Sequence, residues 1–226
     1  MSKRMLFGVL IYSGMLLLNN SAAWAQAGND GVVTINGGRN AVLLRTPSQK
    51  STPAASPSRG LVTIYSNLGK GNKVYSVFSG SGILGKNAGQ MLPQSVANGF
   101  QPKADHTVTE IQVAGTYVQG NNSLIVSLNE DNGHKPGKAL HTWHFTNLPR
   151  FGKCCRLQTA KVAAGIKIKK GKMYWVVLRP VPQFQDTYDV WADNIGGVQG
   201  AYSNNTGSGW NQQSLQTLGG FGVFGK

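Results

Sequence analysis

Short runs rich in valine, isoleucine, threonine, tyrosine and tryptophan dominate the chain after residue 60, and glycine, asparagine, aspartate and proline separate them. No segment sustains the apolar period of about 3.6 residues that marks an amphipathic helix. Leu124, Val126 and Leu128 share one face of a run, which is the alternation of an antiparallel strand with one buried side. The pattern predicts an all-β domain, an antiparallel two-sheet β-sandwich of jelly-roll type. The expected strands span 61–66, 73–78, 107–114, 123–129, 139–146, 173–179, 188–192 and 221–224.

The first 27 residues have the three-part layout of a secretory signal peptide. Lys3 and Arg4 precede an uncharged apolar run from Met5 to Leu18, and the small residues around Ala25 offer a cleavage site. The run is shorter than the roughly 20 residues that a membrane-spanning helix needs, so a retained anchor is the weaker alternative. We expect residues 1–27 to be removed, which leaves no transmembrane segment and a mature protein that is secreted or periplasmic in a bacterium.

The rest of the chain is expected to form a linker and one domain. Residues 28–60 are small, polar and interrupted by prolines, as in a flexible Pro/Ser-rich linker. Within this segment, Val32 to Ile35 and Ala41 to Leu44 flank a glycine-containing turn and form a candidate β-hairpin. Residues 61–226 suffice for one sizeable hydrophobic core but not for two. No repeat of fixed length is visible, which argues against a solenoid or a propeller.

The chain is strongly basic: 22 lysines and arginines oppose eight acidic residues, giving a formal net charge of +14. This balance favours salt-sensitive contact with polyanions. Because the charges are scattered, a solubilising surface is an equally weighted alternative. The densest basic cluster spans 167–172, and its Lys169, Lys170 and Lys172 are predicted to support binding electrostatically. A specific nucleic-acid interface is disfavoured, because the aromatic residues do not alternate with the basic ones.

Tryptophans and tyrosines mixed with asparagine, glutamine and aspartate are the residue types that stack on a sugar face and hydrogen-bond its hydroxyl groups. Trp143 and Trp175 lie in predicted strands, and for any single ring a place in the core is the more frequent role. Trp191, Trp210 and Tyr202 are the predicted stacking residues, since Asn- and Gly-rich segments accompany them in the sequence.

Cys154 and Cys155 are the only two cysteines. An exported chain usually holds such a pair oxidised. Because the two residues are adjacent, a bridge demands a tight turn and closes too small a loop to stabilise the domain much. A structural vicinal disulfide is the first prediction, with unbridged or intermolecular thiols and then a redox switch as alternatives.

Metal sites are not indicated by the sequence. Asn129 to Gly133 gathers oxygen ligands as a calcium loop does, but it lacks the spaced acidic positions of an EF-hand, and a strand-to-strand turn is the favoured interpretation. His141 and His144 would point to opposite faces of a strand and could not bind one zinc ion together. We therefore predict no metal and no cofactor.

Catalytic motifs are also missing from the sequence. It contains no Gly-x-Ser-x-Gly elbow, phosphate loop or His-Glu-x-x-His run. The closest acidic groups, Glu130 with Asp131 and Asp186 with Asp189 and Asp193, lack the context of an acid and base pair. We predict that the protein is not an enzyme, and an extracellular polysaccharide hydrolase stays open as an alternative because carboxylates far apart in sequence can meet.

A series of motifs follows one order along the chain: IYSNLG at 64–69, SLNEDNG at 127–133 with Pro136-Gly137, LPRFGKCC at 148–155, Tyr174-Trp175, Trp191, NNTGSGW at 204–210 and FGVFG at 221–225. Together these motifs resemble the bacterial choice-of-anchor R domain over about residues 61–226. The resemblance implies an exported β-sandwich whose relatives carry varied carboxyl-terminal surface anchors and have no settled activity. Phe221 to Lys226 offers no such anchor, which favours secretion, periplasmic residence or non-covalent adhesion.

The sequence therefore predicts an exported, non-catalytic β-sandwich that binds carbohydrate or an anionic envelope polymer. A structural or adhesive envelope protein without a small ligand is the second hypothesis, and it predicts buried tryptophans, no pocket and self-association. The sequence does not specify the ligand or the oligomeric state.

Overall fold

The computed structural model describes residues 24–26, 32–36, 40–43, 60–71, 73–89 and 91–226. Within these ranges the protein is all β, with sixteen strands and no helix. The strands are β1 (Trp24–Gln26), β2 (Val32–Asn36), β3 (Asn40–Leu43), β4 (Val62–Ser66), β5 (Tyr75–Leu84), β6 (Ser95–Phe100), β7 (His106–Val113), β8 (Gly115–Gln119), β9 (Ser123–Asp131), β10 (Pro136–Thr146), β11 (Gln158–Ile168), β12 (Tyr174–Pro180), β13 (Tyr188–Asn194), β14 (Gln199–Asn205), β15 (Ser214–Thr217) and β16 (Phe221–Gly225).

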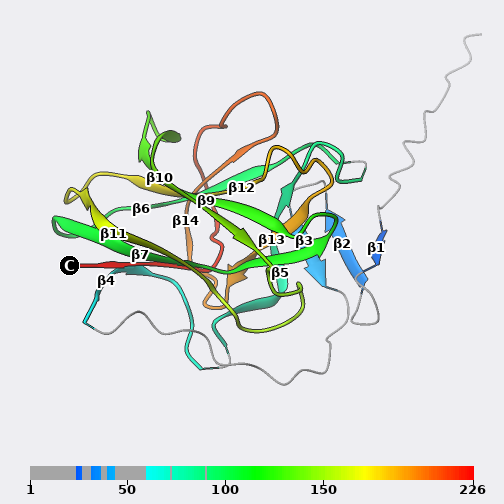
Figure 1. The fold of residues 1–226 in the computed structure, drawn as a ribbon, viewed down its shortest axis with the longest axis horizontal. Helices are drawn as coiled ribbons and strands as arrows, with labels where there is room; N and C mark the ends of the chain where they lie inside the picture. Colours follow the sequence, from blue (N-terminus) through cyan, green and yellow to red (C-terminus); the bar gives the residue numbers. More distant parts are fainter. Residues whose placement is uncertain (1–23, 27–31, 37–39, 44–59, 72, 90) are drawn as a thin grey trace, which may run out of the picture.

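The strands form three antiparallel sheets (Figure 1). Sheet A has the order β1-β2-β3-β5-β13-β8, sheet B the order β11-β7-β16-β4, and sheet C the order β10-β9-β12-β6-β14-β15. Sheets A and B meet at Ala114, whose N–H donates to the Gly220 carbonyl and whose carbonyl accepts from the Ala192 N–H, both at 2.9 Å. The predicted all-β, antiparallel architecture is confirmed and is consistent with a β-sandwich, while the jelly-roll connection stays a prediction.

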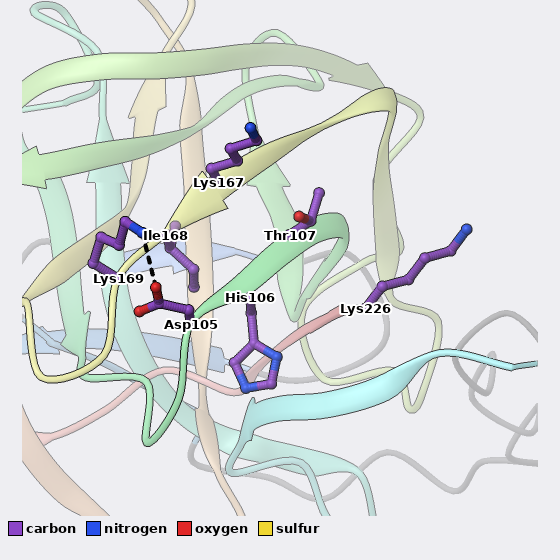
Figure 2. Close-up of a pocket in the computed structure, with 7 residues that line it drawn as sticks. All are labelled: Asp105, His106, Thr107, Lys167, Ile168, Lys169 and Lys226. Carbon is purple, nitrogen blue, oxygen red and sulfur yellow. Dashed lines mark hydrogen bonds and ion pairs between the residues drawn. The ribbon is translucent and has the colours of Figure 1, made fainter.

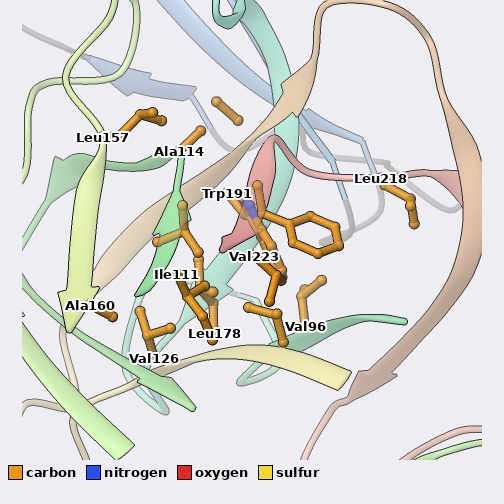
Figure 3. Packing of buried hydrophobic residues seen from close by; sticks show 14 of the residues in the cluster. Val96, Ile111, Ala114, Val126, Leu157, Ala160, Leu178, Trp191, Leu218 and Val223 are labelled. Carbon is orange, nitrogen blue, oxygen red and sulfur yellow. The ribbon is translucent and has the colours of Figure 1, made fainter. Parts of the chain in front are cut away.

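One hydrophobic core receives side chains from all three sheets (Figure 3). Sheet B contributes Ile111 and Val223, sheet C contributes Val126 and Leu178, and sheet A contributes Trp191. All five side chains are fully buried. Burial of apolar side chains between the sheets is therefore the interaction that holds them together.

The central strands of sheet C are buried on both faces, which corrects the expectation of one buried side. Trp175 and Val177 point away from the main core and form a second cluster with Ala97. Met173 and Trp210 pack against this cluster from outside. Strands β9 and β12 therefore have near-continuous burial instead of the alternation that a half-exposed strand would show.

Six strands of the described chain were not expected from the sequence: β1, β6, β8, β11, β14 and β15. Strands β6 and β14 contain glycine, alanine and asparagine, which have low strand propensity, and their pairing partners hold them in the sheet. Strand β11 breaks its alternation with an irregular register between Lys161 and Ile166, where Gly165 adopts a φ of 69°. A glycine accommodates this φ because it has no Cβ.

The candidate hairpin inside the predicted linker is confirmed. Strand β2 pairs antiparallel with β3, with Val33 opposite Leu43 and Asn36 opposite Asn40, and β3 continues sheet A by pairing with β5. Residues 28–31, 37–39 and 44–59 of the predicted linker lie outside the described residues, as do residues 1–23 and 27 of the predicted signal peptide. Strand β1 falls on the predicted cleavage region and pairs with β2. No helix in the described ranges is long and apolar enough to cross a membrane.

Replacing Trp191 by alanine should lower the free energy of unfolding by about 3–5 kcal/mol, because a fully buried indole leaves a cavity between the sheets. Urea denaturation followed by far-ultraviolet circular dichroism measures this change. Leu215→Ala is the control: its side chain is 72% exposed, so the expected change is within about 0.5 kcal/mol. Equal losses in the two variants would contradict the burial described for Trp191.

Candidate functional site

A hollow of about 320 Å³ lies at the end of sheet B and carries mainly charged and polar side chains (Figure 2). It forms where the last residues of β11 pair with the first residues of β7, with Lys167 opposite Thr107 and Ile168 opposite His106. We call it the basic pocket. Its lining consists of Asp105, His106, Thr107, Lys167, Ile168, Lys169 and Lys226.

Strand alternation decides which of these side chains face solvent. Ile168 is buried in the main core, so its neighbours Lys167 and Lys169 are turned outward and are exposed. Figure 2 shows Lys167 and Thr107 on the same side of the β7 and β11 ribbons, with the His106 ring on the other side. The pocket therefore wraps around the end of this strand pair.

The carboxyl-terminal strand brings a third lysine to the pocket. The N–H of Lys226 donates to the Thr107 carbonyl at 3.0 Å, and the N–H of Thr107 donates back to the Lys226 carbonyl at 2.8 Å. This reciprocal pair extends the ladder between β16 and β7. It fixes the backbone of Lys226 beside Thr107.

Asp105 is the only carboxylate side chain among the lining residues named above. It is bound to the turn of residues 167–172, which we call the lysine turn. It accepts a hydrogen bond from Lys169 Nζ at 2.8 Å and another from the Lys170 backbone N–H at 2.8 Å. The hydrogen bond from Lys169 is the main cause of the lowered pKa of Asp105, and Asp105 in turn raises the pKa of Lys169. Both groups therefore stay charged at neutral pH. Among the described residues Lys167 and Lys226 have no ion-pair partner, so the pocket keeps a positive excess.

The backbone of the lysine turn is held from three sides. The Lys169 N–H donates to the hydroxyl of Tyr174 at 3.0 Å, and Gly171 N–H donates to the Pro102 carbonyl at 2.9 Å. The Lys172 N–H closes the turn on the Lys169 carbonyl at 3.3 Å. Tyr174 is buried, so the turn is attached to the core and not only to neighbouring loops.

Of the basic residues singled out in the sequence, Lys169 lines the pocket and Lys170 contributes its backbone N–H. Lys172 is exposed and lies outside the lining. Sequence reasoning missed Asp105, His106, Thr107 and Lys226, which strand pairing brings to the lysine turn. Only the density of lysines at 167–172 pointed to this region.

The predicted stacking residues do not form one site. Trp191 is 0% exposed, and its Nε1 donates to the Gly220 carbonyl at 3.0 Å inside the core. Tyr202 is 3% exposed and also belongs to the core. The prediction that these two rings stack on a sugar is corrected, because a ligand cannot reach them. Trp210 is half-buried against the outer cluster of sheet C, and its ring remains a candidate contact.

The structure brings the sulfur atoms of the neighbouring Cys154 and Cys155 into direct contact, and the structural disulfide stays a prediction. Cys155 is fully buried in the main core, and the neighbouring Lys153 carbonyl accepts a hydrogen bond from the Tyr75 hydroxyl at 3.0 Å. The pair is thus part of the packed interior and does not line the basic pocket.

The segment Asn129 to Gly133 uses its polar side chains internally. Asp131 accepts hydrogen bonds from Trp175 Nε1 at 2.8 Å and from the His134 backbone N–H at 3.2 Å. Asn129 bonds to Ser127 and to the Gly137 carbonyl. These contacts favour the turn interpretation over a calcium loop. In the described ranges no group of three or more His, Cys, Asp or Glu side chains is placed to hold a metal ion.

Two carboxyl groups of β13 have raised pKa values. Asp189 is fully buried, neither of its carboxylate oxygens has a hydrogen-bond partner among the described residues, and desolvation raises its pKa well above the ordinary range. Burial also raises the pKa of Asp193 to about 6, against a lowering effect of the Ser79 hydroxyl. Neither residue lines the basic pocket, and a substrate cannot reach Asp189 in this conformation.

Comparisons with protein-family profiles, with curated proteins and with solved structures gave no match. The resemblance to the choice-of-anchor R domain therefore rests on the motifs at 64–69, 127–133, 148–155 and 204–210, and membership of that family stays a prediction.

Asp189 should make the protein less stable as the pH rises. Folding raises the pKa of Asp189. Its contribution to the free energy of unfolding is therefore fully present below the unfolded-state pKa of about 3.9 and is lost as the pH rises toward the folded-state pKa. Urea unfolding between pH 4 and 8 should show this decline, with Asp193 contributing up to about pH 6. Asp189→Asn should remove most of the slope and raise stability at pH 7, whereas the exposed Asp186→Asn should leave the slope intact. An unchanged slope in Asp189→Asn would refute the assignment.

Proposed function

We propose that this protein is an exported, non-catalytic β-sandwich that binds an anionic envelope polymer through the basic pocket. The observation that carries the proposal is the gathering of Lys167, Lys169 and Lys226 around one hollow that contains a single, already paired side-chain carboxylate, Asp105. A chain with a formal net charge of +14 supports the same partner class.

Electrostatics explains how such a pocket binds a polymer. Exposed lysines attract a polyanion over about one Debye length, roughly 10 Å at 0.1 M salt, and the attraction weakens as salt is added. The backbone of the lysine turn is held by Tyr174 and Pro102, so little loop ordering is needed on binding. The pocket therefore offers a localised anion contact in addition to the diffuse charge of the surface.

The proposed location follows from the amino-terminal sequence. The charged start, the short apolar run and the small residues near Ala25 support export, and the motifs shared with the choice-of-anchor R domain support an extracytoplasmic role. Outside the cytoplasm, acidic polysaccharides, lipopolysaccharide and phosphate-bearing wall polymers present the negative charge that the pocket requires. The same compartment allows the disulfide between Cys154 and Cys155.

Burial of Trp191 and Tyr202 favours a second candidate function, that of a structural or adhesive envelope protein without a small ligand. That hypothesis expects self-association and no pocket. The basic pocket argues for binding, and the oligomeric state of the purified protein separates the two. The polysaccharide hydrolase has less support, because Asp189 is sealed in the interior.

The double variant Lys167→Gln/Lys169→Gln should bind an immobilised anionic polysaccharide about tenfold more weakly than the secreted wild-type protein at 0.1 M salt, because two charge-assisted contacts are lost. Surface plasmon resonance measures the affinities. Lys138→Gln/Lys172→Gln is the matched control: both lysines are exposed and outside the pocket, and the net charge changes equally. Equal weakening in the two double variants would reduce the interaction to nonspecific charge.

Stacking of a sugar on Trp210 makes a separate prediction. If the half-buried ring contacts the polymer, Trp210→Ala should weaken the binding that persists at 0.5 M salt, because stacking is less sensitive to salt than ion pairing. Surface plasmon resonance on the same immobilised polysaccharide measures this residual binding. Wild-type affinity of Trp210→Ala at both salt concentrations would remove stacking from the proposal.

A further inference from the structure

We propose that the basic pocket selects a phosphate group, so that the polymer bound is a phosphate-bearing glycan and not a polyuronate. This inference rests on the proposed function and narrows its ligand class. It is carried by the kind of donors that line the pocket and by the two sides from which they come.

The charged donors of the lining are lysine ammonium groups, and the lining has no arginine guanidinium. The ammonium groups belong to Lys167, Lys169 and Lys226. A guanidinium binds carboxylates and phosphates alike through a planar pair of N–H groups, whereas each lysine binds a single oxygen as a compact charge. The donor set therefore fits several separate oxygen atoms better than one flat carboxylate.

The donors also lie on both sides of the strand pair formed by β7 and β11. Thr107 and Lys167 are cross-strand partners, so their side chains lie next to each other on one side of the sheet, and Figure 2 shows this arrangement. The His106 ring lines the same hollow from the other side of β7. The two donors of one side, Thr107 and Lys167, can each take a separate oxygen of a phosphate, which has more oxygens to share than a carboxylate.

The hydroxyl of Thr107 is the most discriminating member of the set. It stands beside Lys167, which has no ion-pair partner among the described residues, and its backbone N–H and carbonyl are both bonded to Lys226. A hydroxyl adds a neutral, directional donor to a charged phosphate oxygen. Its removal changes no charge, so it tests recognition separately from electrostatic attraction.

Asp105 limits what the pocket accepts. Its carboxylate holds Lys169 Nζ at 2.8 Å and points its negative charge at the same hollow. An incoming anion must outweigh this repulsion. A phosphate monoester carries about −1.5 to −2 charges at neutral pH and a carboxylate only one, so the phosphate gains more from Lys167 and Lys226.

Nucleic acid, which also carries phosphate, is the less suitable partner. Single-stranded nucleic acid is held by aromatic rings that stack on the bases beside the charged groove. His106 is the only ring among the described residues that line the pocket, and Trp210 packs against sheet C, outside this pocket. A glycan with phosphate esters needs no such ring.

Inorganic phosphate is the probe for the first test. Titrated into the secreted, isotope-labelled protein at constant ionic strength, it should give saturating amide shifts at Thr107, Lys167 and Lys169, and acetate should give none at the same concentrations. Thr107→Val should weaken the phosphate affinity about tenfold. Thr142→Val, a half-buried strand threonine outside the pocket, is the matched control and should leave it unchanged. Equal shifts with acetate, or shifts spread over lysines elsewhere, would overturn the selection of phosphate.

A polymer comparison separates this inference from the proposed function. A phosphate-bearing wall polymer should bind at least tenfold more tightly than a polyuronate of equal charge density, and Lys167→Gln/Lys169→Gln should abolish the difference. If both polymers bind equally and both are lost in that variant, the inference fails and the proposed function stands. If neither polymer distinguishes that variant from Lys138→Gln/Lys172→Gln, both proposals fail.

Discussion

The contact between Trp191 and the carboxyl-terminal segment is the constraint on which the rest of the structure depends. The indole Nε1 donates to the Gly220 carbonyl at 3.0 Å, and the ring meets Phe221 edge-on at 5.8 Å between centroids. A Cβ at Gly219 would lie 2.4 Å from the indole, so only glycine allows this approach. Asn67 fixes the same segment by bonding to the Gly219 carbonyl and the Phe221 N–H. Strand β16 is thereby held in sheet B, and Lys226, the residue after its end, reaches the basic pocket.

The same dependence explains which parts of the fold could be predicted from the sequence. Alternation of large apolar residues located β9, β12 and β16, because those strands fill the core with their own side chains. Strands β6 and β14 could not be found in this way. Their small residues are shaped by neighbours, as at Gly99, where a Cβ would lie 2.9 Å from the Ala201 Cβ. Such close approach is a property of the folded sheet and leaves no periodic signal.

The pocket was only partly predictable for a similar reason. The density of lysines at 167–172 drew attention to Lys169, since charge is visible in composition. Thr107 and Lys226 carry no local signal, and the pairing of β11, β7 and β16 alone brings them there. The prediction made for the aromatic residues was wrong because their sequence signal was misleading, not because it was missing. Their chemistry suits a sugar platform and a core equally well, and the sequence around Trp191 did not reveal that the ring is enclosed by three sheets.

Electrostatics acts in two different ways in this molecule. At the exposed pocket, the ion pair between Asp105 and Lys169 has both partners in water, so it adds little stability and serves to orient the lysine. In the interior, Asp189 has no hydrogen-bond partner in the part of the chain that the structure describes, and it opposes folding whenever it is ionised. The charged groups suited to a ligand are therefore those that contribute least to stability, and they can be changed without disturbing the core.

The pocket belongs to sheet B and Trp210 covers sheet C, so only an extended ligand could contact both. For a polymer, the first contact raises the effective concentration at the second, and two weak sites then suffice for firm attachment.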